Sequence, residues 1–243
     1  MYKVMTVGIA LLASSVALGA AMSKGQEKRL RDAAEVLHEI REAPDRDIPG
    51  DLWEKASCVI VIPSVKKGAF IFGAEYGKGV MSCRDAAGWS APSFMVLTKG
   101  SVGFQIGGQT TDLVLLVMNE YGVKHLLEDK VALGAEASIA GGPVGRNARA
   151  MTDAQLKAEI LAYSRAQGLF AGIDLAGGVL KPDTDANEDT YGTQARARDI
   201  VLEKTVTAPP EAAVFLQALH RTAAKAMCAR IDPLKPVAAL LSE

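Results

Sequence analysis

The sequence is poor in the residues and motifs that most enzyme centres require. It contains three histidines and three cysteines among 243 residues, and no two of them fall at the spacing of a zinc site. The phosphate-binding loop GxxxxGK[ST], the dinucleotide motif GxGxxG and the nucleophile elbow GxSxG are all absent. These absences favour a protein that is not an enzyme, and they indicate neither a metal ion nor an organic cofactor.

The chain also lacks an excess of charge of either sign. Its 27 lysines and arginines are balanced by 28 aspartates and glutamates, which gives a formal net charge of -1. Because a nucleic-acid-binding domain usually carries a basic footprint, we expect no nucleic-acid partner. Attraction to an anionic lipid surface therefore requires a local cluster of cations, since the overall field is close to neutral.

The first 21 residues resemble a secretory signal peptide. Lys3 gives a positive start, residues 4–18 are uncharged and mostly apolar, and small residues precede a cleavage site near residues 20–22. The alternative is a retained membrane anchor, because an uncharged run of about 20 residues is just long enough to span a bilayer. We expect a signal peptide at residues 1–21, a single domain at residues 22–243, and a periplasmic or secreted protein that is peripheral to the envelope membranes.

Two segments have the periodicity of amphipathic helices. In residues 26–42 the apolar side chains recur every three or four positions, and Pro44 ends the pattern. The same spacing returns in residues 212–227, directly after Pro209 and Pro210, and proline is well placed in the first turn of a helix. The sequence therefore predicts one helix near each end of the domain.

Between these helices lie short apolar runs that are rich in valine and isoleucine and are separated by glycine or proline. We expect strands at residues 58–62, 69–72, 94–98, 102–106 and 113–118, a short helix within residues 119–129, and a hairpin over residues 159–176. At most one helical turn precedes that hairpin, where Thr152 and Gln155 have the form of a capping box. About eight or nine short strands predict an α+β fold, with a curled antiparallel, barrel-like sheet and the terminal helices packed on it.

An acidic segment, residues 183–189, alternates oxygen-bearing side chains as a calcium loop does. However, Glu188 and Gln194 occupy the positions where such a loop needs glycine and glutamate. We therefore expect a solvated turn at this segment and no metal site.

The cysteines leave two interpretations open. Cys58 and Cys83 lie on candidate neighbouring strands, so that a disulfide bond between them and a pair of buried free thiols are both consistent with the sequence. Cys228 makes the total odd, which is unusual for an oxidising compartment.

Five glycine-punctuated blocks follow one another over about 135 residues. They are SCVIVIPSVKKGAFIFGAEYGKGV, WSAPSFMVLTKGSVGFQIGGQTTDLVLLVMN, LGAEASIAGGPVGRNARA, YSRAQGLFAGIDLAGG and NEDTYG. In this order and spacing they resemble the SYLF domain, in the form of a bacterial secreted single-domain member. The resemblance implies a lipid-binding module that recognises phosphoinositide-like head groups in eukaryotic relatives and actin in some of them. For a secreted chain we expect anionic phospholipid or a membrane surface as the partner, and not actin.

The residues expected to bind this lipid are cations and glycines near turns. Lys66 and Lys67 follow Pro63 in an expected turn, Lys78 lies in the next one, and Gly141 and Gly142 belong to the turn AGGPVG, whose free backbone N–H groups suit a phosphate. The remaining candidates are Arg146, Arg149 and Arg165. The alternative for the glycines is that they only allow the sheet to curve.

Two further functions remain open. One is a scaffolding role at the envelope, in which a helix or a sheet edge engages another protein without lipid. The other is a small hydrolase that uses Asp112 or Asp174, because both carboxylates interrupt apolar strands; the favoured alternative is that each is a hydrogen-bonded structural carboxylate.

Overall fold

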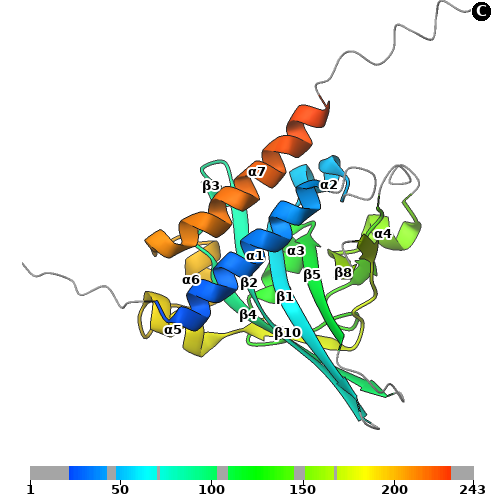
Figure 1. Ribbon diagram of the computed structural model, residues 1–243, viewed down its shortest axis with the longest axis horizontal. Coiled ribbons are helices and arrows are strands. Elements are labelled where there is room, and N and C mark those ends of the chain that lie inside the picture. Colours follow the sequence, from blue (N-terminus) through cyan, green and yellow to red (C-terminus); the bar gives the residue numbers. More distant parts are fainter. Residues whose placement is uncertain are drawn as a thin grey trace, which may run out of the picture.

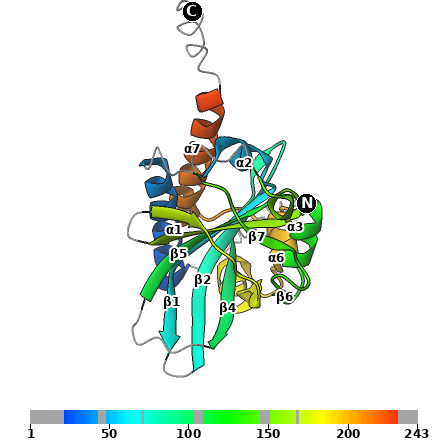
Figure 2. The same cartoon turned by 90° about the vertical axis from the view of Figure 1, so that its right-hand side faces the viewer.

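The structure is a computed structural model that describes residues 22–42, 48–69, 72–102, 109–144, 151–166 and 169–230. The expected signal peptide lies outside these residues. A curled sheet forms the centre of the described part, with helices on both sides (Figures 1 and 2). The predicted α+β class, the curled sheet and the helices near both ends are confirmed.

The chain alternates between long central strands and short flanking elements. The helices are α1 (Lys24–Glu42), α2 (Gly50–Lys55), α3 (Glu120–Leu126), α4 (Asp153–Lys157), α5 (Thr184–Tyr191), α6 (Ala197–Val201), the 3-10 turn η2 (Pro210–Ala212) and α7 (Ala213–Arg230). The strands are β1 (Cys58–Ala69), β2 (Phe72–Asp85), β3 (Gly88–Trp89), β4 (Ser93–Val102), β5 (Gln109–Val117), β6 (Val131–Ala132), β7 (Ile139–Gly141), β8 (Ile160–Ala166), β9 (Leu169–Gly172) and β10 (Gly178–Pro182). No described helix combines the length and the apolar character that crossing a bilayer demands.

The described strands form one sheet in the order β6-β10-β4-β2-β1-β5-β8-β7, with β3 added to β2 and β9 added to β8. Neighbours along this order are antiparallel except β7 and β8, which run parallel. The central strands are longer than predicted. The segments expected as separate strands at residues 58–62 and 69–72 belong to one hairpin, because β1 ends at Ala69 and β2 begins at Phe72. The residues that follow Ile62 interrupt the apolar pattern and shift the register of pairing, but the strand continues to Ala69. Of the strand expected at residues 102–106, only Val102 lies within the described part.

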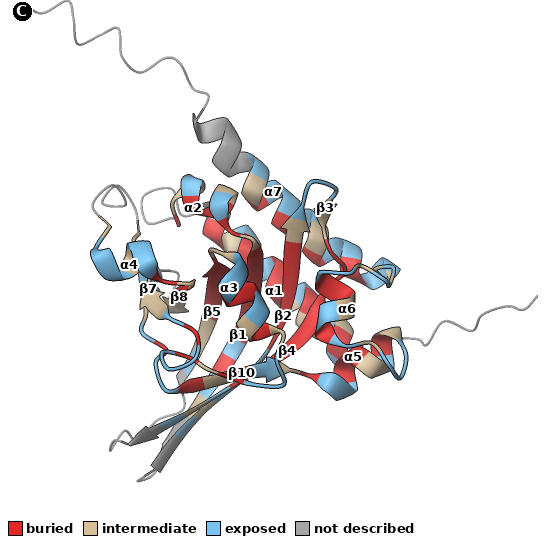
Figure 3. Ribbon diagram, turned by 180° about the vertical axis from the view of Figure 1, so that it is seen from behind, coloured by how far each residue is buried: buried red, intermediate tan, exposed pale blue. Residues whose placement is uncertain are grey.

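Helices cover the two faces of the sheet with separate hydrophobic cores. Helices α1 and α7 lie side by side across one face (Figure 1), where Leu30 and Phe215 pack with Val59 and Val61 of β1. Helices α3 and α6 fill the inside of the curl (Figure 3), where Val123 and Ile200 pack with the residues of β1 that alternate with the first set. A fully buried side chain of this kind contributes about 1.5–3 kcal/mol. The two cores thus fix the curvature of the sheet between them.

The central strands run beyond the helices at one end (Figure 2). Along β2, Val80 is fully buried, whereas Lys78 and Tyr76 on the same face are exposed. One part of the sheet face that carries α1 is therefore open to solvent.

Several local elements of the second half agree with the sequence, and one contradicts it. The hairpin of β8 and β9 is confirmed, as are the helical turn α4 with a capping box formed by Thr152 and Gln155, and the short helix α3. The prediction of a solvated turn at residues 183–189 is wrong, because the segment forms helix α5. Its inner face consists of Ala186, Asn187 and Thr190, which are small or polar, so that hydrophobic periodicity gave no signal. The Asn187 side chain accepts a hydrogen bond from the Phe94 N–H at 2.8 Å and donates one to the Phe94 carbonyl at 3.2 Å.

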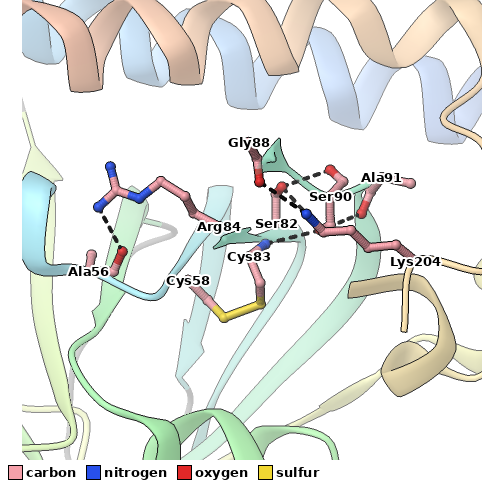
Figure 4. The surroundings of a disulfide bond; sticks show 9 residues. All are labelled: Ala56, Cys58, Ser82, Cys83, Arg84, Gly88, Ser90, Ala91 and Lys204. Carbon is pink, nitrogen blue, oxygen red and sulfur yellow. Dashed lines mark hydrogen bonds between the residues drawn. A yellow bond between two sulfur atoms is a disulfide. The ribbon is translucent and has the colours of Figure 1, made fainter. Parts of the chain in front are cut away.

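Of the two interpretations left open for Cys58 and Cys83, the structure shows the disulfide bond. Cys58 and Cys83 lie directly opposite each other on β1 and β2 and form a disulfide bond in the covered end of the hairpin (Figure 4). Next to it, the Ser90 hydroxyl accepts a hydrogen bond from the Cys83 N–H at 3.1 Å, and Arg84 donates to the Ala56 carbonyl at 3.2 Å. This end of the hairpin is therefore held covalently and by polar contacts.

Candidate functional site

Three lysines from three strands gather on the open part of the sheet face. Lys66 of β1 lies opposite Tyr76 of β2, whereas Lys78 of β2 and Lys181 of β10 both lie opposite Val96 of β4. Because directly opposite residues in a sheet share a face, these side chains stand on the same side as α1. All three lysines and Tyr76 are exposed. We call Lys66, Lys78, Lys181 and Tyr76 the lysine face.

A β-bulge in β1 determines which lysine belongs to this face. Val61 packs in the α1 core, yet Val65 packs in the core inside the curl, because one extra residue lies between Val61 and Lys66 relative to β2. Simple alternation from Val61 would have turned Lys67 toward α1. With the bulge, Lys66 takes that side and lines a cleft beside α1, whereas Lys67 pairs with Glu75 at 2.9 Å.

One hydrogen bond and two glycines fit the bulge into the sheet. Ser64 has a left-handed φ of 51°, and its N–H donates to Asp112 Oδ1 at 2.8 Å. On the other side, a Cβ atom at Gly77 or Gly79 of β2 would overlap the Ile62 side chain. Glycine is required there because the bulged backbone approaches β2 closely.

An ion triad of two buried side chains and the exposed Lys78 forms the floor of the lysine face. Asp183, which precedes α5, accepts from Arg29 Nη1 at 2.9 Å and from Lys78 Nζ at 3.1 Å. The Arg29 and Asp183 side chains are only 10% and 9% exposed, and the guanidinium lies 5.0 Å from the centroid of the Phe94 ring. One carboxylate thus meets two cations, which leaves a positive charge at the floor.

Two adjoining clefts open beside this triad. Cleft A, with a volume of about 530 Å³, lies between the start of α1, the strands β1 and β2, and α5. Cleft B, of about 370 Å³, lies between β2, β4, β10 and the start of α5. Tyr76, Lys78, Asp183 and Asp185 line both clefts. The lysine face and the triad therefore belong to one continuous polar surface.

Lys67 and Arg165, two of the other predicted lipid-binding residues, do not join this surface. Lys67 lies on the opposite face of β1, and Lys66, Lys67 and Lys78 all lie within strands, so their predicted placement in turns is wrong. Arg165 forms an ion pair with Glu39 of α1 and another with Asp112 at 3.1 Å, which occupies its guanidinium.

Gly141 and Gly142 lie at the far side of the sheet, in and just after β7. The Gly142 N–H donates to the Ala162 carbonyl at 3.0 Å, so it does not point freely at a ligand. A Cβ atom at Gly142 would overlap the ring of Tyr163, and one at Gly141 would lie 3.1 Å from the backbone of Ile173. Close packing accounts for both glycines. Arg146 and Arg149 lie outside the described residues, and their lipid-binding role stays a prediction.

The carboxylates considered for catalysis make structural contacts. Asp112 binds the bulge and Arg165, and Asp174 accepts from the Ala176 N–H at 2.8 Å. Burial, together with the charges of Glu35 and Asp32, raises the pKa of Asp112 despite the hydrogen bond from Ser64. Among the described residues no group of three or more His, Cys, Asp or Glu is arranged to hold a metal ion.

Sequence reasoning missed Arg29, Tyr76, Lys181 and Asp183 as members of the site. Arg29 lies in the helix expected at residues 26–42, and 154 positions separate it from the carboxylate that it binds. The available signal was weak: Lys181 and Asp183 stand two positions apart next to Pro182, at the end of a strand that the sequence did not predict.

Comparison with known proteins agrees with the motif blocks. The model of the Ysc84 family, described as "Las17-binding protein actin regulator", matches residues 98–222, which is just over half of the 243-residue chain. LAS seventeen-binding protein 3 of Saccharomyces cerevisiae is 33% identical over 170 residues, covering 68% of this chain and 37% of that protein. SH3 domain-containing YSC84-like protein 1 of Homo sapiens is 31% identical over 185 residues, covering 75% of this chain and 53% of that protein.

The chain thus spans between about a third and a half of the length of these relatives. The names of the relatives describe binding or regulatory proteins and no enzymatic activity. On the strength of the family match, the chain belongs to the Ysc84 family, whose domain is the SYLF domain.

Proposed function

We propose that this protein binds anionic phospholipid at a membrane surface of the cell envelope, without catalysis. The observation that carries the proposal is the convergence of Lys66, Lys78 and Lys181 around Tyr76 on an uncovered sheet face. A lysine near an anionic membrane contributes about 1 kcal/mol of attraction, so that a group of three acts although the whole chain is nearly neutral.

Tyr76 adds a second reason to place this face against lipid. It is 45% exposed, lies opposite Lys66 and stands two positions from Lys78 on the same face of the sheet. A tyrosine with an apolar ring and a polar hydroxyl suits the boundary between head groups and acyl chains. The lysines therefore suit the charged head groups of a membrane, and Tyr76 suits the boundary between the head groups and the acyl chains.

The interior of the curl supports binding at a surface over binding of a whole lipid inside the sheet. Ile60, Met81, Met95, Leu97 and Leu115 are all fully buried there and pack in one core with α3 and α6. A single lipid molecule would have to displace these side chains, at a cost of about 2–5 kcal/mol for each site left poorly packed. The location at the envelope follows from the signal-like residues 1–21 and is part of the proposal.

A protein partner is the second candidate function. The family description and the yeast relative are both named for binding Las17, which favours a protein-interaction role for the shared domain. In a secreted protein such a partner would belong to the envelope, and binding would not require lipid.

Vesicle cosedimentation tests the proposal with a matched pair of variants. Lys66→Gln removes a cation from the lysine face, whereas Lys67→Gln removes one from the next residue, on the opposite face and paired with Glu75. We expect Lys66→Gln to weaken binding to vesicles of phosphatidylglycerol and phosphatidylcholine about fivefold, which corresponds to about 1 kcal/mol. Lys181→Gln should act equally, and Lys67→Gln should change little.

Equal binding of the native protein to pure phosphatidylcholine vesicles and to phosphatidylglycerol vesicles would overturn the anionic preference. Equal losses in the Lys66 and Lys67 variants would show that the lysine face is not the contact.

A further inference from the structure

The charged residues that line cleft A separate into those already paired and those that are not. Arg29 and Lys78 bind Asp183, and Lys28 pairs with Asp32 at 2.5 Å. Within the described part of the chain, the structure gives no ion pair to the other charged lining residues, which are Lys66, Asp185 and Asp189. The cleft therefore offers one cation and two carboxylates to a ligand.

These remaining charges come from different walls. Lys66 projects from the strand side, where it lies opposite Tyr76, and its charge is exposed. Asp185 and Asp189 are four residues apart on α5, so that they stand on the same side of that helix, and both are exposed. The cleft has a cationic wall of strands and an anionic wall of helix.

A head group that carries only negative charge fits one wall and is repelled by the other. A zwitterion that joins a phosphodiester to an ammonium group fits both, because the phosphate meets Lys66 and the ammonium meets the two carboxylates. A volume of about 530 Å³ lies within the usual range of ligand pockets and accommodates a head group while the acyl chains stay in the membrane.

We propose that cleft A binds the head group of an aminophospholipid, with the phosphate at Lys66 and a primary ammonium between Asp185 and Asp189. This inference rests on the proposed function, because the lysine face must first bring the protein to a membrane. The anionic lipid then supplies the general attraction, and the aminophospholipid supplies the specific contact.

The primary ammonium is the distinguishing feature of this ligand. Like the ammonium of a lysine side chain, it has three N–H donors for carboxylate oxygens. A choline group carries the same charge but has no N–H donor. Exchange of phosphatidylcholine for phosphatidylethanolamine therefore changes the contact to α5 and leaves the net charge of the vesicle unchanged.

The test uses vesicles with a fixed fraction of phosphatidylglycerol, in which the remaining phosphatidylcholine is replaced by phosphatidylethanolamine. We expect this exchange to strengthen binding of the native protein about threefold, as for two exposed charge contacts. The double variant Asp185→Asn/Asp189→Asn should lose this gain. It should bind the phosphatidylglycerol and phosphatidylcholine vesicles at least as tightly as the native protein does, because two repelling charges are gone.

The matched control is Glu188→Gln. Glu188 is the neighbour of Asp189 on α5 but lines a different cleft, beside α6, so the gain should persist in this variant. Soluble glycerophosphoethanolamine should also compete away the gain in the native protein, whereas glycerophosphoglycerol should not. If the double variant fails to fold, this competition still tests whether the native protein binds the head group of phosphatidylethanolamine.

The outcomes separate the two proposals. Absence of binding to every vesicle overturns the proposed function, and the present inference falls with it. Binding to phosphatidylglycerol vesicles without any gain from phosphatidylethanolamine, or a gain that survives in the double variant, overturns the aminophospholipid site alone.

Discussion

The two halves of the β1–β2 hairpin have the same strands and opposite surroundings. At the covered half, Val59 and Val80 are fully buried under α1 and α7, and the disulfide bond joins the strands on the other face. At the open half, the face that carries α1 bears Lys66, Lys78 and Tyr76. The covered half is built for stability, whereas the open half is the part for which we propose contact with lipid. The difference arises from where the helices end, since β1 and β2 stay paired on both sides of the bulge, with the register shifted by one residue.

Removal of the disulfide bond is the strongest expected perturbation of the covered half. Cys58 and Cys83 are 25 positions apart, and a cross-link that closes a loop of this length stabilises a protein by about 3–4 kcal/mol. Cys58→Ala/Cys83→Ala should lose this amount in urea unfolding followed by tryptophan fluorescence. At temperatures where the variant stays folded, its vesicle binding should equal that of the native protein. An unchanged urea midpoint would show that the disulfide bond does not stabilise the covered half.

The ion triad lies at the border between the halves and should affect both. Asp183→Asn leaves Arg29 and Lys78 without their shared carboxylate, and we expect a loss of about 3 kcal/mol in the free energy of unfolding. Asp51→Asn is the control, because its pair with Lys55 is exposed and is worth less than about 1 kcal/mol. A comparable loss in both variants would mean that the triad is no stronger than a surface ion pair.

The bulge can be tested by adding a single methyl group. In Gly79→Ala the new Cβ atom would overlap the Val61 carbonyl and lie 2.7 Å from the Ile62 side chain, so the variant should lose about 1–3 kcal/mol in thermal unfolding. Gly100→Ala in β4 is the matched change, since nothing lies within 4 Å of its Cβ position. Equal melting temperatures for the two variants would argue against close packing at the bulge.

The smallest effect concerns pH and Asp112, which supports the bulge. Burial raises the pKa of Asp112 in the folded protein, so the folded state takes up this proton at a higher pH than the unfolded chain does. As the pH falls from 7 to about 4, the native protein should therefore gain stability relative to Asp112→Asn. The measurement is the difference between their free energies of unfolding along this pH series. A difference that shrinks as the pH falls would show that the carboxylate is held in its charged form.

Most of the elements were predictable from local patterns, because each depends on neighbours in the sequence. The amphipathic spacing in residues 26–42 and the capping box at Thr152 and Gln155 correspond to α1 and α4. Helix α5 escaped prediction because Asn187 is buried by hydrogen bonds to Phe94 and not by its hydrophobicity. Of the site, the sequence indicated Lys66 and Lys78 as lipid-binding candidates but placed them in turns.

The sequence by itself determined the family, the fold class and the positions of the main helices and the hairpin, since the spacing of apolar residues and glycines carries that information. Only the tertiary structure decided which lysines share a surface. One extra residue in β1 turns Lys66 instead of Lys67 toward α1, and the bulge that contains it is stabilised by Asp112 from another strand. The Arg29–Asp183 contact joins α1 to a residue that lies 154 positions later in the chain. Such contacts depend on how the chain packs in space, and no local periodicity records them.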